Sequence, residues 1–201
     1  MIKPTLEQMK QELIEEHREI NIYDDWAEPV YEWFEEYLEE RGISWIYHED
    51  NKTRAMEWSG FYSQGDGFGF GGCIIQSGLP KYLGNRYPMM QKLNECGLWF
   101  EVTWNPRNNQ TTPVSITHDL FIDMAGDNPL AEVWDTELLR EVESFESDLE
   151  EDIESLCKMM YRKLEEEYDY LTSDEQVWET IVANDLNSIT NDEGEISWLS
   201  A

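Results

Sequence analysis

Residues 131–170 read AEVWDTELLREVESFESDLEEDIESLCKMMYRKLEEEYDY, the longest regular pattern in the chain. Its apolar side chains recur at steps of three and four residues, the period of one face of an α-helix. They are Leu138, Val142, Phe145, Leu149, Ile153, Leu156 and Met160. The stretch therefore predicts one long helix with an apolar stripe for packing and polar sides.

The same helix carries a dense set of carboxylates. Residues 141–157 hold eight acids and no base before Lys158. At 1.5 Å per residue, one carboxylate falls about every 2.5 Å of axis, against about 1.7 Å per phosphate charge in duplex DNA. Two interpretations stand: a solvated face that keeps the protein soluble, or a surface that imitates DNA. The residues assigned to the second are Glu143, Asp148, Glu150, Glu151 and Glu154, taken to face water.

Patterns on both sides of this helix predict a mixed set of elements. Further helices are expected at about 5–20, 25–41, 88–96 and 172–184, with capping signals at Thr5, Asp25 and Thr172 and a stop at Gly42. Short strands are expected at 43–48, 54–59, 73–75, 98–104 and 114–122. Residues 60–72 are expected to be a loop, and the tail either an edge strand or loose.

The order of these elements predicts an α+β fold. A mostly antiparallel sheet of about four to five strands is packed by the N-terminal helices and the long acidic C-terminal helix. One domain is expected over residues 1–201, comprising a helical arm (1–42), a β-rich centre (43–125) and an acidic helical region (131–185).

The net charge of −30 is distributed unevenly along the 201 residues. Residues 1–50 carry 15 acids against 4 bases, and residues 131–201 carry 22 against 4, whereas the centre is nearly neutral. Such a chain repels nucleic acid and anionic membranes, so basic protein surfaces are the expected partners. The aromatic side chains on the helix at 25–41 have two interpretations: they form a dimer interface, or they form a hot spot for a protein partner.

Cysteines, histidines and the N-terminus indicate no catalytic or metal chemistry. Cys73, Cys96 and Cys157 lack metal-ligand spacing, and His17, His48 and His118 lack a partner at helical spacing. A structural role is expected for each histidine, and no metal or cofactor is expected. The first residues lack the apolar core of a signal peptide, and no apolar run reaches the roughly 20 residues that span a bilayer.

The glycine-rich segment Ser59–Gly67, SGFYSQGDG, is the second distinctive motif. It has no Walker lysine and no strand-to-helix context, which weighs against a phosphate cradle. A structural turn is one interpretation. A recognition loop that uses Ser63, Gln64 and Asp66 is the other.

This motif and the segment Tyr161–Glu175, YRKLEEEYDYLTSDE, together resemble a family of proteins encoded by tailed bacteriophages and prophages. The resemblance extends in order from about residue 22 to 185. It implies a phage origin and a role in the host cytoplasm. It carries over no activity and no site residue.

Charge and resemblance together predict a non-enzymatic inhibitor. It would occupy the DNA-binding surface of a host protein or defence complex, in the manner of anti-restriction or anti-CRISPR proteins, without binding nucleic acid itself. The alternative is a phage accessory protein that recognises a ligand or partner through residues 63–67, with the charge serving solubility only. An enzyme that uses a buried pair of carboxylates is a third alternative, but nothing in the sequence selects such a pair.

Overall fold

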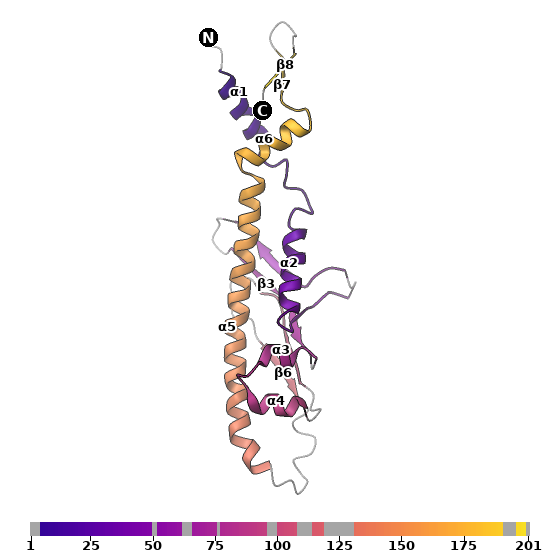
Figure 1. Ribbon diagram of the computed structural model, residues 1–201, viewed down its shortest axis with the longest axis vertical. Helices are drawn as coiled ribbons and strands as arrows, with labels where there is room; N and C mark the ends of the chain where they lie inside the picture. The colour runs from indigo at the N-terminus through magenta and orange to yellow at the C-terminus, as the bar shows by residue number, and fades with distance from the viewer. Residues whose placement is uncertain are drawn as a thin grey trace. The chain divides into compact units, whose positions relative to one another are not determined.

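The computed structural model describes residues 5–49, 52–61, 66–75, 77–95, 100–107, 114–118, 131–190 and 196–199. The chain forms two compact units, of which the first joins residues up to Val30 to those from Lys163 onward, and the second covers Tyr31–Arg162. Helices and antiparallel strands together confirm the α+β fold (Figure 1). Among the described residues, no helix is long and apolar enough to cross a membrane.

With the exception of α3, the described helices lie within a few residues of the positions that the sequence periodicities predicted. They are α1 (Leu6–Glu16), α2 (Glu28–Glu39), α3 (Leu79–Leu83), α4 (Pro88–Glu95), α5 (Ala131–Leu171) and α6 (Asp174–Ala183). The strands are β1 (Ser44–Trp45), β2 (Met56–Ser59), β3 (Gly67–Phe70), β4 (Gly72–Ile74), β5 (Phe100–Trp104), β6 (Val114–His118), β7 (Ser188–Thr190) and β8 (Ile196–Trp198).

The second unit contains a four-stranded sheet with the order β1-β4-β5-β6, in which every neighbouring pair is antiparallel. Strands β2 and β3 form a separate antiparallel pair. Gly72 lies opposite Trp104, and a Cβ at Gly72 would overlap the Trp104 indole. The absence of a side chain at Gly72 therefore lets this indole cover the strand.

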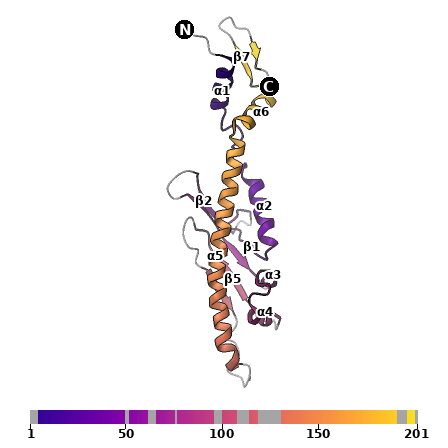
Figure 2. The same ribbon diagram turned by 60° about the vertical axis from the view of Figure 1, so that its left-hand side comes forward.

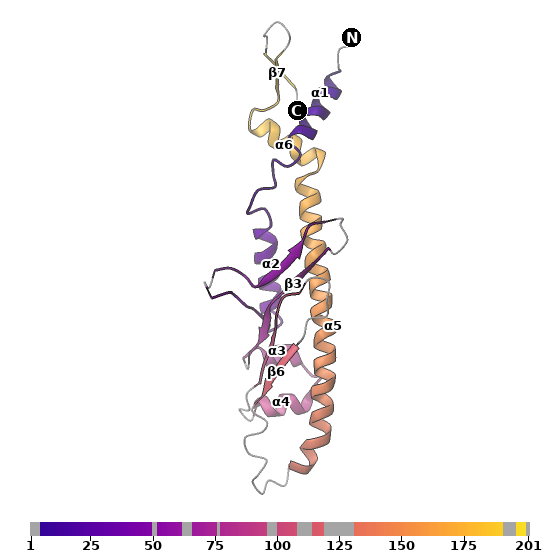
Figure 3. The ribbon, with the colours of Figure 1, turned by 180° about the vertical axis from the view of Figure 1, so that it is seen from behind.

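Helix α2 covers one face of the strands, as views from the front and from behind agree (Figures 1 and 3). The contact is made by Phe34, whose ring meets those of Trp45, Phe68 and Phe70 edge-on at centroid distances of 5.2 to 5.9 Å. Edge-to-face packing suits aromatic quadrupoles, and all four rings are buried. Helix α2 ends at Glu39, and Gly42, the predicted stop, follows three residues later with a φ of +79°.

The apolar stripe of α5 is confirmed where its side chains are described. Phe145, Leu149, Ile153, Leu156 and Met160 are all buried, and Leu164 extends the stripe by one turn. Helices α3 and α4 lie beside the first half of α5 (Figures 1 and 2). Each buried side chain of this size contributes about 1.5–3 kcal/mol, so the stripe contributes strongly to the packing of the helix.

Residues 67–70 correct one prediction. The loop expected over 60–72 contains strand β3, whose residues are all buried and pair with β2. Glycine alternates with phenylalanine over Gly67–Phe70. A Cβ at Gly69 would overlap the backbone of Arg107, so glycine is needed where this other backbone segment approaches the strand closely.

Two smaller differences concern one short helix and one helix cap. Helix α3 has only five residues, too few for a periodic pattern, and was not predicted. Helix α6 is capped by Ser173, whose side chain accepts from the Gln176 amide, and not by Thr172, whose hydroxyl donates to the Tyr168 carbonyl.

The first unit is built from α1, α6 and the β7–β8 pair. The predicted capping box of Thr5 and Gln8 is present at the start of α1. A small core joins the elements and consists of Ile14, Val177, Trp178, Ile181 and Leu199. The tail contributes strand β8, which pairs antiparallel with β7 in a two-stranded sheet.

Candidate partner-binding surface

The acids of α5 fall into two groups that differ in exposure and partners. Glu141, Asp148 and Asp152 are half-buried and accept hydrogen bonds from the segment that contains α3 and α4. Glu143, Glu146, Glu150, Glu151 and Glu154 are exposed. We call these five residues the outward acidic face. The division follows helical geometry, because positions 141, 148 and 152 lie on one flank of the apolar stripe.

Glu141 caps helix α4 from outside that helix. Its Oε2 accepts from the backbone amides of Met89 at 2.9 Å and Met90 at 3.1 Å. These amides lie in the first turn of α4, where backbone donors have no partner within the helix. The carboxylate therefore accepts from two such donors, and its negative charge interacts favourably with the positive end of the helix dipole.

Asp148 and Asp152 each accept from a tyrosine. The Tyr87 hydroxyl donates to Asp148, and the Tyr82 hydroxyl donates to Asp152 at 2.6 Å. Arg86 lies 3.7 Å from the Asp152 carboxylate. Burial and the carboxylate acceptors raise the pKa of both phenols. Phe145 lies edge-on to both tyrosine rings, at 5.8 and 5.5 Å.

These contacts correct one part of the prediction. Asp148 was expected to face water with the other four residues, but it is half-buried and bound to Tyr87. The sequence pattern did not reveal this because Tyr87 lies 61 positions away along the chain. Glu146, which the prediction omitted, is exposed on the outward acidic face.

The outward acidic face has fewer carboxylates per length of helix than the eight acids of residues 141–157 implied. Its five carboxylates span residues 143–154, about one per 3–4 Å of helix axis. That spacing matches one strand of DNA, at about 3.4 Å per phosphate, and is about half the duplex density. Within the described part of the chain, only Glu154 is paired, to Lys158 at 2.5 Å. Arg140, Lys158 and Arg162 are also exposed and reduce the negative field locally.

The second candidate site lies largely outside the described residues. Ser63 and Gln64 are not among them. Asp66 precedes β3, is half-buried and has an interaction partner. The proposed recognition loop therefore stays a prediction.

Of the remaining candidates, His17 and Cys157 have a described environment. The His17 ring lies 3.0 Å from the Leu13 carbonyl at the end of α1, so it closes that helix. Cys157 is half-buried, and burial raises the pKa of its thiol to about 11. Cys96 lies outside the described residues. Across the described ranges, no three metal-ligating side chains converge.

Comparison with known proteins identifies a family and no nearer relative. A family model described as a domain of unknown function, DUF8835, matches residues 26–174. Searches of curated proteins and of solved structures found no match.

Proposed function

The chain belongs to the DUF8835 family, and we propose that it binds a basic, DNA-binding surface of a host protein or defence complex through the outward acidic face of α5. In this proposal the protein is a phage-encoded inhibitor in the host cytoplasm and no enzyme. The observation that carries it is the division of acids on α5: three are used to hold the helix, and five are left exposed.

The exposed carboxylates have the chemistry of phosphate substitutes. Arginine and lysine side chains that bind DNA phosphates also form charge-assisted hydrogen bonds with carboxylates. Glu143, Glu146, Glu150 and Glu151 have no hydrogen bond or ion pair within the described residues, so they would meet a partner without first breaking a contact.

The three half-buried acids at 141, 148 and 152, which we call the inward acids, support the same function indirectly. Glu141, Asp148 and Asp152 tie α5 to the segment of α3 and α4, so the face is carried by a supported helix. A preorganised surface binds with a smaller entropy cost than a flexible acidic tail.

The test uses two variants of identical net charge. The first replaces all five residues of the outward acidic face with Gln. The control replaces five exposed acids of the first unit, which are Glu7, Glu12, Glu16, Glu19 and Glu179. Tagged proteins are incubated with host lysate, eluted with rising salt, and the captured proteins are challenged with duplex DNA.

We expect the wild type and the control to retain a DNA-binding protein that duplex DNA displaces. The outward variant should bind that purified protein at least about 10-fold more weakly, with a shallower salt dependence. Equal affinity of all three proteins would defeat the proposal. So would the absence of any captured protein that DNA displaces.

A further inference from the structure

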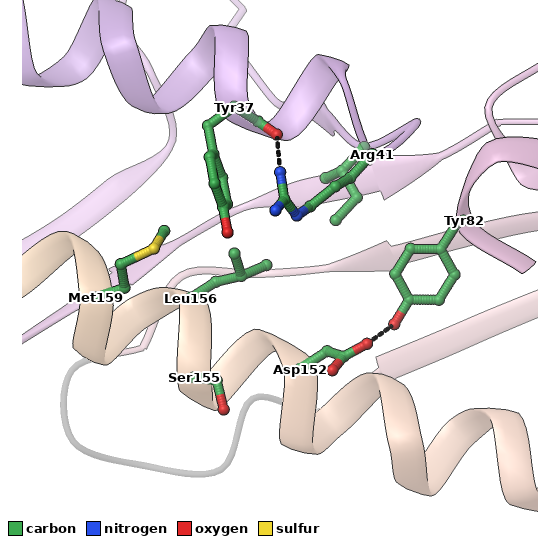
Figure 4. A pocket seen from close by; sticks show the side chains of 8 residues that line it. Tyr37, Arg41, Tyr82, Asp152, Ser155, Leu156 and Met159 are labelled. Atoms are coloured by element: carbon green, nitrogen blue, oxygen red, sulfur yellow. Dashed lines mark hydrogen bonds between the residues drawn. The ribbon is translucent and has the colours of Figure 1, made fainter.

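A pocket of about 200 Å³ lies within the second unit, between the end of α2, α3 and α5 (Figure 4). Its polar lining includes Tyr37, Arg41 and Asp152, and its apolar lining includes Ile43, Leu156 and Met159. Figure 4 shows Tyr37 and Arg41 entering from the α2 side and facing Leu156 on α5. The volume is below the roughly 300–1,000 Å³ of drug-sized sites, so it suits a small molecule.

Arg41 is the distinctive group of this pocket. Its Nη1 donates to the Tyr37 carbonyl at 3.0 Å, and its guanidinium carbon lies 3.4 Å from the centroid of the Tyr37 ring. No carboxylate pairs with it among the described residues, although acids outnumber bases 44 to 14 in the chain. A half-buried guanidinium with several free donors is a binding group for an anion.

Other half-exposed arginines of the chain are neutralised by acids. Arg54 contacts Glu35 at 3.1 Å, and Arg18 contacts Asp174 at 2.9 Å. Arg41 instead rests on the Tyr37 ring, which fixes the guanidinium plane by a cation–π contact. The planar fork is thereby held in place with donors remaining for a bidentate carboxylate.

The other walls define what the anion is attached to. Ile43 and Leu156 are buried apolar side chains, and Met159 is half-buried, so the ligand has an apolar body. The Tyr37 hydroxyl has no hydrogen-bond partner among the described residues and supplies a further donor. Asp152 is already bound to Tyr82, and its negative charge disfavours a dianion such as phosphate.

We propose that this pocket binds a small monocarboxylate with an apolar body, whose carboxylate is held by the guanidinium of Arg41. The site is separate from the outward acidic face, because none of the five residues of that face lines it. It is a ligand site for a small molecule in a protein otherwise suited to a macromolecular partner.

The experiment titrates the full chain with hexanoate and 3-phenylpropionate, followed by ¹H–¹⁵N NMR of the arginine side chains and by calorimetry. The comparators are 3-phenyl-1-propanol, which lacks the charge, and inorganic phosphate. We expect saturable binding of at least one carboxylate, about 10-fold or more tighter than that of the alcohol or phosphate, with a shift of the Arg41 Nε–H signal.

Variants at Arg41 assign the effect. Arg41→Gln should weaken carboxylate binding about 10-fold or more, Arg41→Lys should retain part of it, and the exposed Arg140→Gln should leave it unchanged. Circular dichroism verifies that each variant is folded. The proposal is overturned if neither carboxylate saturates, if the alcohol or phosphate binds as well, or if folded Arg41→Gln binds like the wild type.

Discussion

The hydroxyl of Tyr82 on α3 lies 2.6 Å from Oδ2 of Asp152 on α5 and donates a hydrogen bond to it. Tyr82 is 9% exposed, so a largely buried phenol connects two helices that lie 70 positions apart. A carboxylate in this position acts as a structural acceptor. The negative charge of α5 thus has a folding role on one flank and remains exposed on another.

Removal of this hydroxyl should destabilise the second unit. Tyr82→Phe keeps the ring but removes the phenolic donor to Asp152, and we expect a loss of about 1–2 kcal/mol of unfolding free energy. Urea denaturation measures it. Tyr37→Phe is the matched control, since the Tyr37 hydroxyl has no partner among the described residues, and it should change stability by less than about 0.5 kcal/mol. Equal effects of the two substitutions would contradict the role of the hydrogen bond.

Stability should fall in alkaline solution because of the same tyrosines. Burial and the carboxylates raise the pKa of Tyr82 and Tyr87 in the folded protein above the value of about 10 in an unfolded chain. Their contribution is therefore complete below pH 10 and is lost as the pH rises, because only the unfolded chain ionises readily. The double variant Tyr82→Phe, Tyr87→Phe should show a flatter stability profile above pH 10. A wild-type profile no steeper than that of the variant would refute this assignment.

Two glutamates in α5, two residues apart, should behave differently. Glu141→Gln weakens the cap on the first turn of α4 and should cost about 1 kcal/mol. Glu143→Gln removes an exposed charge and should change stability by less than about 0.5 kcal/mol. Urea titrations of both variants under one buffer condition give the comparison. If Glu143 proved the more costly of the two, the division into inward and outward acids would be wrong.

Gly42 should tolerate no side chain. It has a φ of +79°, and a Cβ there would overlap the carbonyl oxygen of Gly78, which packs against it. Gly42→Ala should therefore destabilise the second unit by about 2 kcal/mol or more, through backbone strain and the clash. Gly60→Ala is the control, since nothing lies within 4 Å of a Cβ at Gly60. Thermal unfolding monitored by circular dichroism should show a lower midpoint for the first variant only.

Cys157 should react slowly with alkylating reagents. Burial raises the pKa of its thiol to about 11, so little thiolate is present at pH 8. Labelling with iodoacetamide, followed by peptide mass spectrometry, should proceed at least about 10-fold more slowly in the native protein than in urea. A native rate equal to the unfolded rate would show that the thiol is accessible and ionised.

Local patterns predicted those elements whose signals lie within a few residues. The long helix matched because Leu149, Ile153 and Leu156 repeat at its own period, and the cap at Thr5 needs only Gln8. The strand at Gly67–Phe70 was missed because its regular alternation uses glycine, which is also a loop residue. Gly69 allows the backbone of Arg107 to approach closely. The position of that other segment cannot be read from the sequence of the strand.

The candidate surface was predicted in part. Exposure of Glu143, Glu150, Glu151 and Glu154 followed from their places on the helix. The hydrogen bond of Asp148 could not be predicted in this way, since its donor, Tyr87, lies in a distant segment of the chain. The Arg41 pocket had no sequence signal, because an unpaired arginine is recognisable only when its neighbours are known.

The amino-acid sequence by itself determined the large negative charge, the length and apolar stripe of α5 and the α+β order of elements, because these depend on composition and on short-range periodicity. Only the tertiary structure decided which carboxylates remain free. Glu141, Asp148 and Asp152 meet donors that the chain supplies from 51 to 70 residues away, whereas Glu143 and Glu150 meet none within the described residues. The physical reason is that charge is a property of each residue, but its availability to a partner depends on what folding brings beside it.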